Sequence, residues 1–482
     1  MRRFIGAVFS IFLPSYPRTL VYMLQATEYQ VAPFLKWYWR TQNYQMVMKR
    51  RSLEMTGPAR MLLAAVRVGI TVQVIAGLVL VYFGVYRGFA GGEAFGIAVI
   101  LAYPVLWAHL LVVPLLLGRE LISKPAERKL IAESKALFMN HPGIKIAVAG
   151  SYGKTTMKEL LLTVLSHGLS VAATPANKNV SISHAYFARK LTGTEDVVIL
   201  EYGEGAPGDI ARFAVITQPT HAVITGLAPA HLDQYKTFDA AAQDIFSLAA
   251  FVPADKFYVN ADSPHIESYA PPECVQFTTH GALGWRVSAL KTDVHGTSFV
   301  LSRGKDKLQL HSALVGKHQA GFLAFAAALA HELGLSAEQI RSGIAATKPF
   351  EHRMQPYQMG GAWIIDDTYN GNLEGIRAGT QLLADLSAKR KIYVTPGLVD
   401  QGVESERVHT EMGGLIADAR PDLVVLMRNS ASDAICAGLQ AAGYAGKLQI
   451  ESVPLDFYTN LKHFVAAGDL VVMQNDWTDN YA

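Results

Sequence analysis

The chain has 482 residues, of which 50% are hydrophobic and 17% are charged, and its formal net charge is +3. This length exceeds a single hydrophobic core and predicts two or three folded units, while so apolar a balance indicates membrane segments. The small charge, without a basic block interleaved with aromatics near the motifs below, gives no indication of nucleic-acid binding, and two distant cysteines, Cys274 and Cys436, exclude a disulfide framework or a Cys-rich zinc site.

The first residues look like the start of a signal peptide, because Arg2 and Arg3 precede an apolar run at residues 4–13. No small-residue cleavage site follows, so we expect an uncleaved, membrane-associated segment. Residues 22–51 mix aromatic residues with cations, which is typical of an interfacial amphipathic helix. A helix in a soluble core is the alternative for this stretch.

Two runs without any charged residue follow at residues 68–86 and 94–117. A helix needs about 20 apolar residues to cross a bilayer, so both runs are predicted to span it, with a buried core hairpin as the alternative. Cations flank the outer ends of the pair, at Lys49, Arg50, Arg51 and Arg60 before it and at Arg119, Lys124, Arg128 and Lys129 after it. Because cationic flanks stay on the cytoplasmic side, the rest of the chain is predicted to face the cytoplasm. We therefore expect a membrane region at residues 1–120 and a linker helix at 121–140.

Residues 143–161 carry a strand, a glycine-containing loop and the start of an amphipathic helix. The glycines allow backbone N–H groups to surround phosphate oxygens, the lysine supplies a cation, and the first threonine hydroxyl can bind Mg²⁺. The loop is therefore predicted to bind a nucleotide phosphate, and a loop without phosphate is the alternative. Its residues are Gly150, Ser151, Tyr152, Gly153, Lys154, Thr155 and Thr156.

The general pattern of such loops places a glycine where this chain has Val148. The shorter form found here, a glycine four residues before the lysine followed by GKTT, resembles the ATP loop of the Mur ligases, which form amide bonds in peptidoglycan precursor synthesis. The resemblance covers about residues 143–476. It implies a P-loop central ATPase domain at 141–352 and a Rossmann-like C-terminal domain at 353–482.

Periodicity in this region also predicts an α/β fold with largely parallel sheets, because short apolar strands alternate with helical stretches. Residues 287–310 instead look like an antiparallel excursion with a Val-His-Gly-Thr turn. The parallel strands are expected at residues 144–148, 197–200, 222–225, 257–259, 392–395 and 423–427.

Glu201 follows the strand at 197–200, at the edge where open α/β sheets bind their ligands. A carboxylate there can hold Mg²⁺ opposite the phosphate loop, and a solvated strand end is the alternative. The segment Glu-Tyr-Gly-Glu-Gly-Ala-Pro-Gly-Asp-Ile is similar to the Glu-X-Gly-Ala-X-X-Pro-Gly-Glu-Ile segment of Mur ligases that add D-alanyl-D-alanine. This resemblance implies that Glu201 is a metal ligand.

His231 lies in the segment after the next strand, which resembles the family's Asn-Ile-Gly-X-Ala-His-Leu. The histidine of that segment helps to bind a second cation, although Gly226 here replaces the asparagine. The family's carbamoylated lysine, about ten residues later, has no counterpart at residues 240–245. The second metal site therefore stays open, unless Lys236 or Asp244 substitutes.

Three further segments resemble substrate-binding or nucleotide-binding parts of the family. The segment at 174–180 resembles a Gly-Asn-X-Asn-Asn loop over the carboxylate substrate, which implies substrate contacts from Asn177 and Asn179, with a plain turn as the alternative. Asn260 lies in an Asn-Ala-Asp strand end near the nucleotide base. Residues 316–319 resemble Gly-X-His-Asn, but Phe322 stands where an asparagine is usual, so nucleotide contacts are expected to differ there.

Arg353 matches the arginine that closes the central unit of the family and can bind phosphate in a bidentate way. Residues 364–372, IIDDTYNGN, nearly repeat a family segment and form the most specific match, with a plain turn as the alternative. The resemblance implies that Asp367 binds the ribose hydroxyls. It also implies that three residues lie beside the transferred phosphate, namely Tyr369, Asn370 and Asn372.

The last unit, with residues 391–397, Gly402 and His409, resembles the family's amine-binding domain. Its end departs from the family, because Gln-Asn-Asp-Trp at 474–477 replaces a Lys-Gly-Ser segment, so recognition of the amine is expected to differ. The usual N-terminal domain that grips the uridine nucleotide is missing, and the predicted membrane segments stand in its place.

Together these features imply an ATP- and Mg²⁺-dependent peptide ligase at the cytoplasmic (inner) membrane. The γ-phosphate of ATP passes to a carboxylate, and an amine attacks the acyl phosphate, with ADP and phosphate released. The implied substrates are a muramoyl peptide, soluble or lipid-linked, and D-alanyl-D-alanine. The implied catalytic residues are Lys154, Glu201, His231 and Tyr369.

Two alternatives remain open for the function. One is a related ligase that adds another amine to a lipid-linked precursor. The other is a membrane-tethered, nucleotide-binding regulator that has lost catalysis, which the missing lysine and the changed terminus favour.

Overall fold

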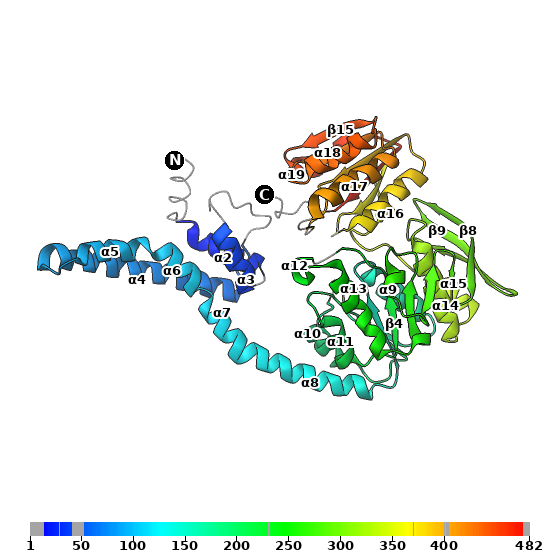
Figure 1. The fold of residues 1–482 in the computed structure, drawn as a ribbon, viewed down its shortest axis with the longest axis horizontal. Coiled ribbons are helices and arrows are strands. Elements are labelled where there is room, and N and C mark those ends of the chain that lie inside the picture. Colours follow the sequence, from blue (N-terminus) through cyan, green and yellow to red (C-terminus); the bar gives the residue numbers. More distant parts are fainter. Residues whose placement is uncertain are drawn as a thin grey trace. The chain divides into compact units, whose positions relative to one another are not determined.

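The computed structural model describes residues 14–27, 29–40, 53–176, 178–229, 232–369, 371–399, 401 and 404–475. The chain divides into two compact units, residues 1–129 and 130–482. The ribbon is drawn in Figure 1. Among the expected features, the signal-like run at 4–13 and the cations at 49–51 lie outside the described residues.

The first unit is helical and has its own small core. Tyr16 is buried there, and its hydroxyl donates a hydrogen bond to the carbonyl of Pro104 at 2.8 Å. The described part of the stretch expected to form an interfacial helix contains the end of one short helix and a second short helix, which end at Ala26 and Arg40. The helices of the unit are α2 (Tyr16–Ala26), α3 (Val31–Arg40), α4 (Gly57–Arg87), α5 (Gly92–Leu101), α6 (Tyr103–Leu110) and α7 (Val113–Gly118).

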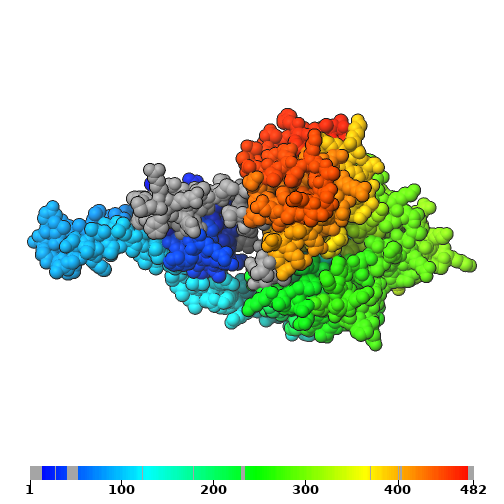
Figure 2. Space-filling model, turned by 45° about the horizontal axis from the view of Figure 1, so that its top comes forward, coloured from blue at the N-terminus to red at the C-terminus, as the bar shows by residue number. Residues whose placement is uncertain are grey.

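Helices α4 and α5 form a tight hairpin and run side by side in Figure 1. Glycines allow this close approach, since a Cβ on Gly96 would lie 2.5 Å from the carbonyl oxygen of Gly77. On the face drawn in Figure 2, the end of this hairpin is not covered by other parts of the unit. Among the described residues, the helix Gly57–Arg87 and the consecutive helical segments from Tyr103 to Asn140 are long and apolar enough to cross a membrane by length and composition.

The first expected span, 68–86, lies within the single helix α4, whereas the second, 94–117, is divided among α5, α6 and α7. Pro104 and Pro114 stand in the first turns of α6 and α7, where a proline is tolerated, but each lacks the N–H that would continue the preceding helix. The expected linker helix is α8 (Lys124–Asn140), which follows a π-helical turn at Arg119–Ser123.

The second unit contains a ten-stranded sheet in the order β10-β9-β8-β7-β6-β5-β4-β1-β3-β2. Strands β1 to β6 pair in parallel, and β6 to β10 pair antiparallel, so both the parallel sheet and the antiparallel excursion predicted from the sequence are confirmed. The strands are β1 (Ile144–Ala149), β2 (Val171–Ala173), β3 (Val197–Glu201), β4 (His221–Ile224), β5 (Phe257–Asn260), β6 (Val275–Thr278), β7 (Gly281–Ala282), β8 (Trp285–Asp293), β9 (Gly296–Arg303) and β10 (Asp306–Ser312).

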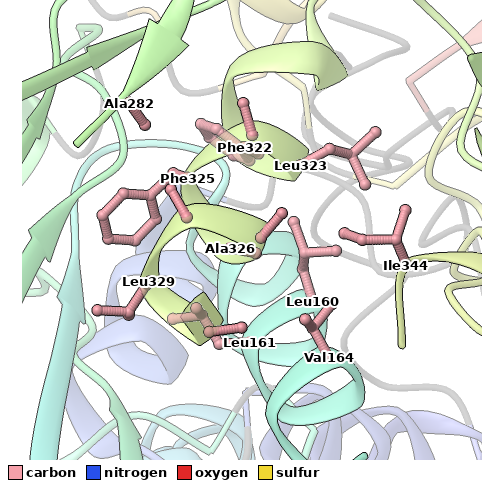
Figure 3. Packing of buried hydrophobic residues seen from close by; sticks show 14 of the residues in the cluster. Leu160, Leu161, Val164, Ala282, Phe322, Leu323, Phe325, Ala326, Leu329 and Ile344 are labelled. Carbon is pink, nitrogen blue, oxygen red and sulfur yellow. The ribbon is translucent and has the colours of Figure 1, made fainter. Parts of the chain in front are cut away.

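Alternate residues of β1 enter two different cores, because successive side chains of a strand point to opposite faces of the sheet. Ile146 and Val148 pack with α9 (Lys154–Leu165), α14 (Gln319–Glu332) and α15 (Ala337–Ala345). Figure 3 shows Leu160 and Val164 of α9 turned toward residues of α14. Ala147 packs in the other core, whose helical residues come from the end of α8, α10 (Ser181–Ala188), α11 (Asp209–Thr217) and α13 (Phe238–Phe246).

A second sheet of six strands has the order β11-β12-β16-β13-β14-β15 and is parallel except for β11. Its strands are β11 (Gln355–Met359), β12 (Ala362–Asp367), β13 (Arg390–Thr395), β14 (Leu423–Met427), β15 (Lys447–Glu451) and β16 (Asp469–Gln474). One face packs on α16 (Leu373–Asp385), α17 (Ser405–Asp418) and α18 (Ser432–Ala441). The other face packs on α19 (Pro454–Thr459) and α20 (Leu461–Phe464).

Candidate active site

The predicted phosphate loop joins the end of β1 to the start of α9. Gly150 has φ +138° and Gly153 has φ +75°, which are conformations that favour glycine. A Cβ on Gly150 would also overlap the Thr225 side chain. The loop delivers the chain to the N-terminus of a twelve-residue helix, where free backbone N–H groups and the helix dipole attract an anion.

Lys154 is held by two oxygen atoms at this loop. Its Nζ donates to the carbonyl of Gly150 at 2.5 Å and to Oε2 of Glu204 at 2.7 Å. The Glu204 side chain is almost completely buried. The sequence interpretation did not single out Glu204, although an acidic residue three positions after Glu201, in a glycine-rich segment, was the available signal.

Glu201 ends β3 beside β1 and is also buried. Its Oε1 accepts hydrogen bonds from the Thr155 hydroxyl at 3.0 Å and from Asn179 Nδ2 at 3.3 Å. Its Oε2 lies 3.3 Å from Nζ of Lys158, a fully buried cation that the sequence interpretation also missed. The structure thus brings three of the expected site residues together.

His184 orients the backbone at this strand end. Its Nε2 donates to the Glu201 carbonyl at 2.8 Å, and burial lowers the pKa of His184 to about 4, so the ring is neutral at physiological pH. Three expected site residues, Asn177, His231 and Asn370, lie outside the described residues.

Asp244, one expected substitute for the missing lysine, is engaged in holding the loop after β3. Its Oδ1 accepts from the Gly208 N–H at 2.8 Å, and its Oδ2 accepts from the Tyr235 hydroxyl at 2.7 Å. Burial, together with the hydrogen bond to Asp244, raises the pKa of Tyr235 and keeps that hydroxyl protonated. Lys236, the other expected substitute, is exposed and has φ +66°.

The phosphate loop and the acidic, asparagine-rich turn line one cavity of about 480 Å³. This volume is in the range of small-molecule sites. The lining residues before position 330 are Tyr152 and Gly153 of the loop, Thr156 of α9, Asn260 of β5 and Phe322 of α14. The lining residues that lie in or next to the second sheet include Arg353, Asp367, Tyr369 and Asn372. Residues that are about 200 positions apart in the sequence therefore face the same space.

Asp367 is half-buried at the end of β12. Its Oδ1 accepts from the Met354 N–H at 3.2 Å, and its Oδ2 accepts from Gln474 Nε2 at 2.8 Å. Burial raises the pKa of Asp367 to about 7. Gln474 is fixed in turn by the Tyr393 hydroxyl, which donates to its Oε1 at 2.8 Å. Gln474, which lies in the C-terminal segment that differs from the family pattern, therefore holds the Asp367 carboxylate.

Two other expected residues of this turn have structural partners. The guanidinium carbon of Arg353 lies 4.3 Å from the centroid of the Tyr369 ring, in a cation–π arrangement. Asn372 caps α16, because its Oδ1 accepts from the Gly375 N–H at 2.9 Å. Asn260 also holds a strand end, since its Nδ2 donates to the Thr225 carbonyl at 2.9 Å.

Both positions that depart from the family pattern near the loop pack against the loop itself. A Cβ on Gly226 would overlap the Tyr152 ring, so an asparagine does not fit there. The Tyr152 hydroxyl donates to Ser263 at 2.9 Å, and burial raises the pKa of Tyr152 to about 12. Phe322 lies against the backbone of Gly153, because a Cβ added to Gly153 would lie 2.9 Å from the Phe322 ring.

The donor set at the loop fits Mg²⁺. No group of three or more His, Cys, Asp or Glu side chains suited to a metal is present among the described residues. Mg²⁺, however, commonly takes one or two carboxylates together with water and phosphate oxygens. Glu204 Oε1 is buried and accepts no hydrogen bond from the part of the chain that the structure describes. Glu201 Oε2 is buried too, and its contact there is the ion pair with Lys158 at 3.3 Å.

Two segments of the chain match known protein families. Residues 148–330 match the Mur ligase middle domain, and residues 352–474 match the Mur ligase, glutamate ligase domain. Among curated relatives, UDP-N-acetylmuramoyl-tripeptide–D-alanyl-D-alanine ligase of Escherichia coli is 27% identical over 291 residues, or 59% of this chain. The Synechocystis protein of the same name is 33% identical over 297 residues, or 61% of this chain. The chain covers 64% of the length of each of these relatives.

Solved structures agree with the fold. MurF from Acinetobacter baumannii has a TM-score of 0.63 at 21% identity, with 72% of this chain and 77% of that chain covered. MurF from Thermotoga maritima in complex with ADP has a TM-score of 0.62 at 21% identity, with 73% and 80% covered. At 21% identity, these two structures support the fold of this chain and nothing finer. The candidate site is argued from the geometry described above.

Proposed function

The chain contains the middle and C-terminal domains of the Mur ligases, and from this premise we propose that it is an ATP-dependent ligase that forms an amide bond. The observation that supports this function best is the single cavity lined by the phosphate loop and by the turn with Asp367. A nucleotide with its phosphates at the loop extends along this cavity toward Asp367. The ligase lobes in this proposal are residues 141–352 and 353–482.

In the proposed reaction, a substrate carboxylate attacks the γ-phosphate of ATP to form an acyl phosphate and ADP. An amine then attacks the acyl carbon, and inorganic phosphate leaves as the amide bond forms. Lys154 and Arg353 stabilise the charge that develops on the phosphate oxygens. Thr155, Glu201 and His231 would hold Mg²⁺, which would neutralise further phosphate charge when bound.

The other proposed roles concern orientation. Asp367 binds the ribose hydroxyls, and Asn260 is proposed to lie near the base. Asn177, Asn179 and Asn370 are proposed to orient the acceptor carboxylate, while Tyr369 and Asn372 are proposed to lie beside the transferred phosphate.

We propose a muramoyl peptide as the acceptor and D-alanyl-D-alanine as the donor. The support is that the curated relatives are named for a UDP-N-acetylmuramoyl-tripeptide and D-alanyl-D-alanine. Because the chain covers only 64% of those relatives, the acceptor is proposed as either soluble or lipid-linked.

We further propose that residues 1–120 attach the enzyme to the cytoplasmic face of the inner membrane. The apolar windows of the two candidate helices are only 11% and 18% buried, so most of their side chains are available to lipid. A membrane attachment would bring the active site close to a lipid-linked acceptor.

The decisive experiment measures phosphate release by the purified full-length protein. We expect release from ATP only when a muramoyl tripeptide and D-alanyl-D-alanine are both present. Release only with a different amine would identify a related ligase, and release only with a lipid-linked tripeptide would decide between the two proposed forms of the acceptor. Nucleotide binding without turnover across a panel of amines and acceptors would favour a regulator and contradict the proposal.

A further inference from the structure

We propose that Glu204 is a metal ligand at the phosphate loop and binds the Mg²⁺ of the bound nucleotide together with Glu201. This inference rests on the proposed function, since it assumes that the loop binds nucleotide phosphates. It adds a residue to the site that neither the loop motif nor the strand-end glutamate identifies.

The first argument is that one oxygen of the buried Glu204 carboxylate accepts no hydrogen bond from the described residues. Glu204 is 5% exposed, and its Oε2 lies 2.7 Å from Lys154 Nζ. Its Oε1 is buried and accepts no hydrogen bond from the described residues. A buried carboxylate oxygen without a partner is unfavourable, and a cation is one of the few groups that resolve it.

The second argument is what phosphate binding would do to this ion pair. The lysine of such a loop normally reaches the outer phosphates of the nucleotide. Once Lys154 turns to a phosphate, Glu204 loses its cation in a buried position beside new negative charge. A divalent cation between the carboxylate and the phosphate compensates both groups at once.

The third argument is position. Lys154, which contacts Glu204, is followed in the chain by Thr155, whose hydroxyl lies 3.0 Å from Glu201 Oε1. The two carboxylates therefore approach consecutive residues of one loop. Two carboxylates, a threonine hydroxyl, water and phosphate oxygens form a typical Mg²⁺ environment.

A competing role for Glu204 is a latch that only holds Lys154. The two roles differ in how Mn²⁺ and ADP affect each other's binding. A metal ligand strengthens ADP binding in the presence of Mn²⁺, so its removal lowers the ratio of ADP dissociation constants without and with Mn²⁺. A latch competes with the phosphate, so its removal strengthens ADP binding equally in both conditions and leaves the ratio unchanged.

The test is calorimetric titration of ADP into the full-length protein, in detergent, with and without Mn²⁺. The variants are Glu204→Gln, which keeps an acceptor for Lys154, and Glu204→Asp, which keeps the charge on a shorter side chain. Glu133→Gln is the matched control, because it removes the same charge from a partly exposed glutamate paired with Arg189 on the surface. Paramagnetic resonance of Mn²⁺ provides a second readout that does not depend on catalysis.

We expect E204Q to lower the Mn²⁺ enhancement of ADP binding by about 10-fold or more, which is the size typical of lost metal-site interactions. E204D is expected to be intermediate, and E133Q is expected to equal the wild type. An unchanged enhancement in a folded E204Q protein would overturn the proposal, and if E204Q does not fold, an E204D protein with wild-type enhancement and Mn²⁺ spectrum would do the same. A wild-type protein that binds no ADP would instead contradict the proposed function.

Discussion

Lys154 provides the positive charge of the phosphate loop, and Lys154→Ala tests that role. Loss of hydrogen bonds to a charged group costs about 1.5–3 kcal/mol, which corresponds to roughly 10- to 150-fold in affinity. We expect ADP binding to weaken by that factor in calorimetric titration. Lys190→Ala, which removes an exposed lysine, is the control.

The lysine variant also leaves Glu204 without its ion-pair partner. The double variant K154A/E204Q removes that buried charge and, when ADP is titrated without a divalent cation, separates lost stability from lost phosphate contact. If the double variant regains wild-type affinity for ADP, Lys154 does not bind phosphate.

Asp367 makes the stability of the second unit depend on pH. Its pKa is raised from 3.8 to about 7 by burial, so the folded chain binds more protons than the unfolded chain between those values. Stability therefore falls as pH rises from about 4 to about 7, by at most about 1.4 kcal/mol per pH unit, and this contribution is constant above that interval.

Asp367→Asn removes this titration while preserving the shape of the side chain. The thermal midpoint of wild type is expected to fall relative to that of D367N between pH 5 and pH 8. Asp418→Asn, at an exposed position, should follow wild type across the same range. A constant difference between wild type and D367N would show that Asp367 titrates normally.

Gly226 is expected to be intolerant of any side chain because of Tyr152. A Cβ at position 226 would overlap the tyrosine ring, and overpacking of this kind costs about 1–3 kcal/mol. Gly226→Ala should therefore lower the thermal midpoint, and Y152A/G226A should recover part of the loss. Additive losses in the double-mutant cycle would contradict a direct steric conflict.

At the scale of elements, Asn372 at the beginning of α16 has two possible roles, one as a helix cap and one as a nucleotide contact. Asn372 caps the helix through Gly375 and also lines the cavity. Asn372→Ala should cost about 1 kcal/mol of stability through the lost cap. Asn372→Asp keeps a capping acceptor but adds negative charge beside the proposed phosphate site, so stability should be retained while ADP binding weakens.

Thermal unfolding and ADP titration of both variants check this separation. Asn429→Asp is the comparison for an added charge outside the cavity, since Asn429 is a partly buried residue near the start of α18. If N372D binds ADP as tightly as wild type, Asn372 serves only as a cap.

The elements of the phosphate site were predictable because local patterns determine them. Alternating apolar residues defined β1, and glycines with a following lysine and threonines defined the loop and α9. Glu201 was predictable because strand ends meet at one edge of a parallel sheet. Glu204 and Lys158 were missed because their burial depends on packing between distant segments, which residue spacing does not encode.

The helices of the first unit could be predicted less well, because composition does not show where a helix is interrupted. Composition predicted one continuous span at 94–117, but Pro104 and Pro114 divide it into shorter helices. Average hydrophobicity measures affinity for lipid and is insensitive to a single missing N–H donor. The two prolines are the sequence signal for this division.

For the whole molecule, the family resemblance correctly indicated that two α/β lobes share one cavity, which no local pattern could establish. Arg353 and Tyr369 meet because they flank the antiparallel strands β11 and β12 at the same end of the second sheet. The family also indicated where this chain departs from it, and packing around Tyr152 and Gln474 gives those departures physical reasons. No family resemblance helps to predict the membrane region, since both family matches begin after residue 147.

Membrane attachment through α4 is tested by placing a charge on its apolar surface. Leu78 is 56% exposed in this helix, and an arginine near the centre of a spanning helix costs about 2.5–3.5 kcal/mol of insertion free energy on the translocon scale. We expect Leu78→Arg to increase the fraction of protein extracted from membranes by alkaline carbonate. Leu455→Arg is the matched control, because Leu455 is 72% exposed in α19 of the second unit and should leave membrane attachment unchanged. If L78R and L455R are extracted equally, the exposed surface of α4 does not face lipid and the hairpin belongs to a soluble interface.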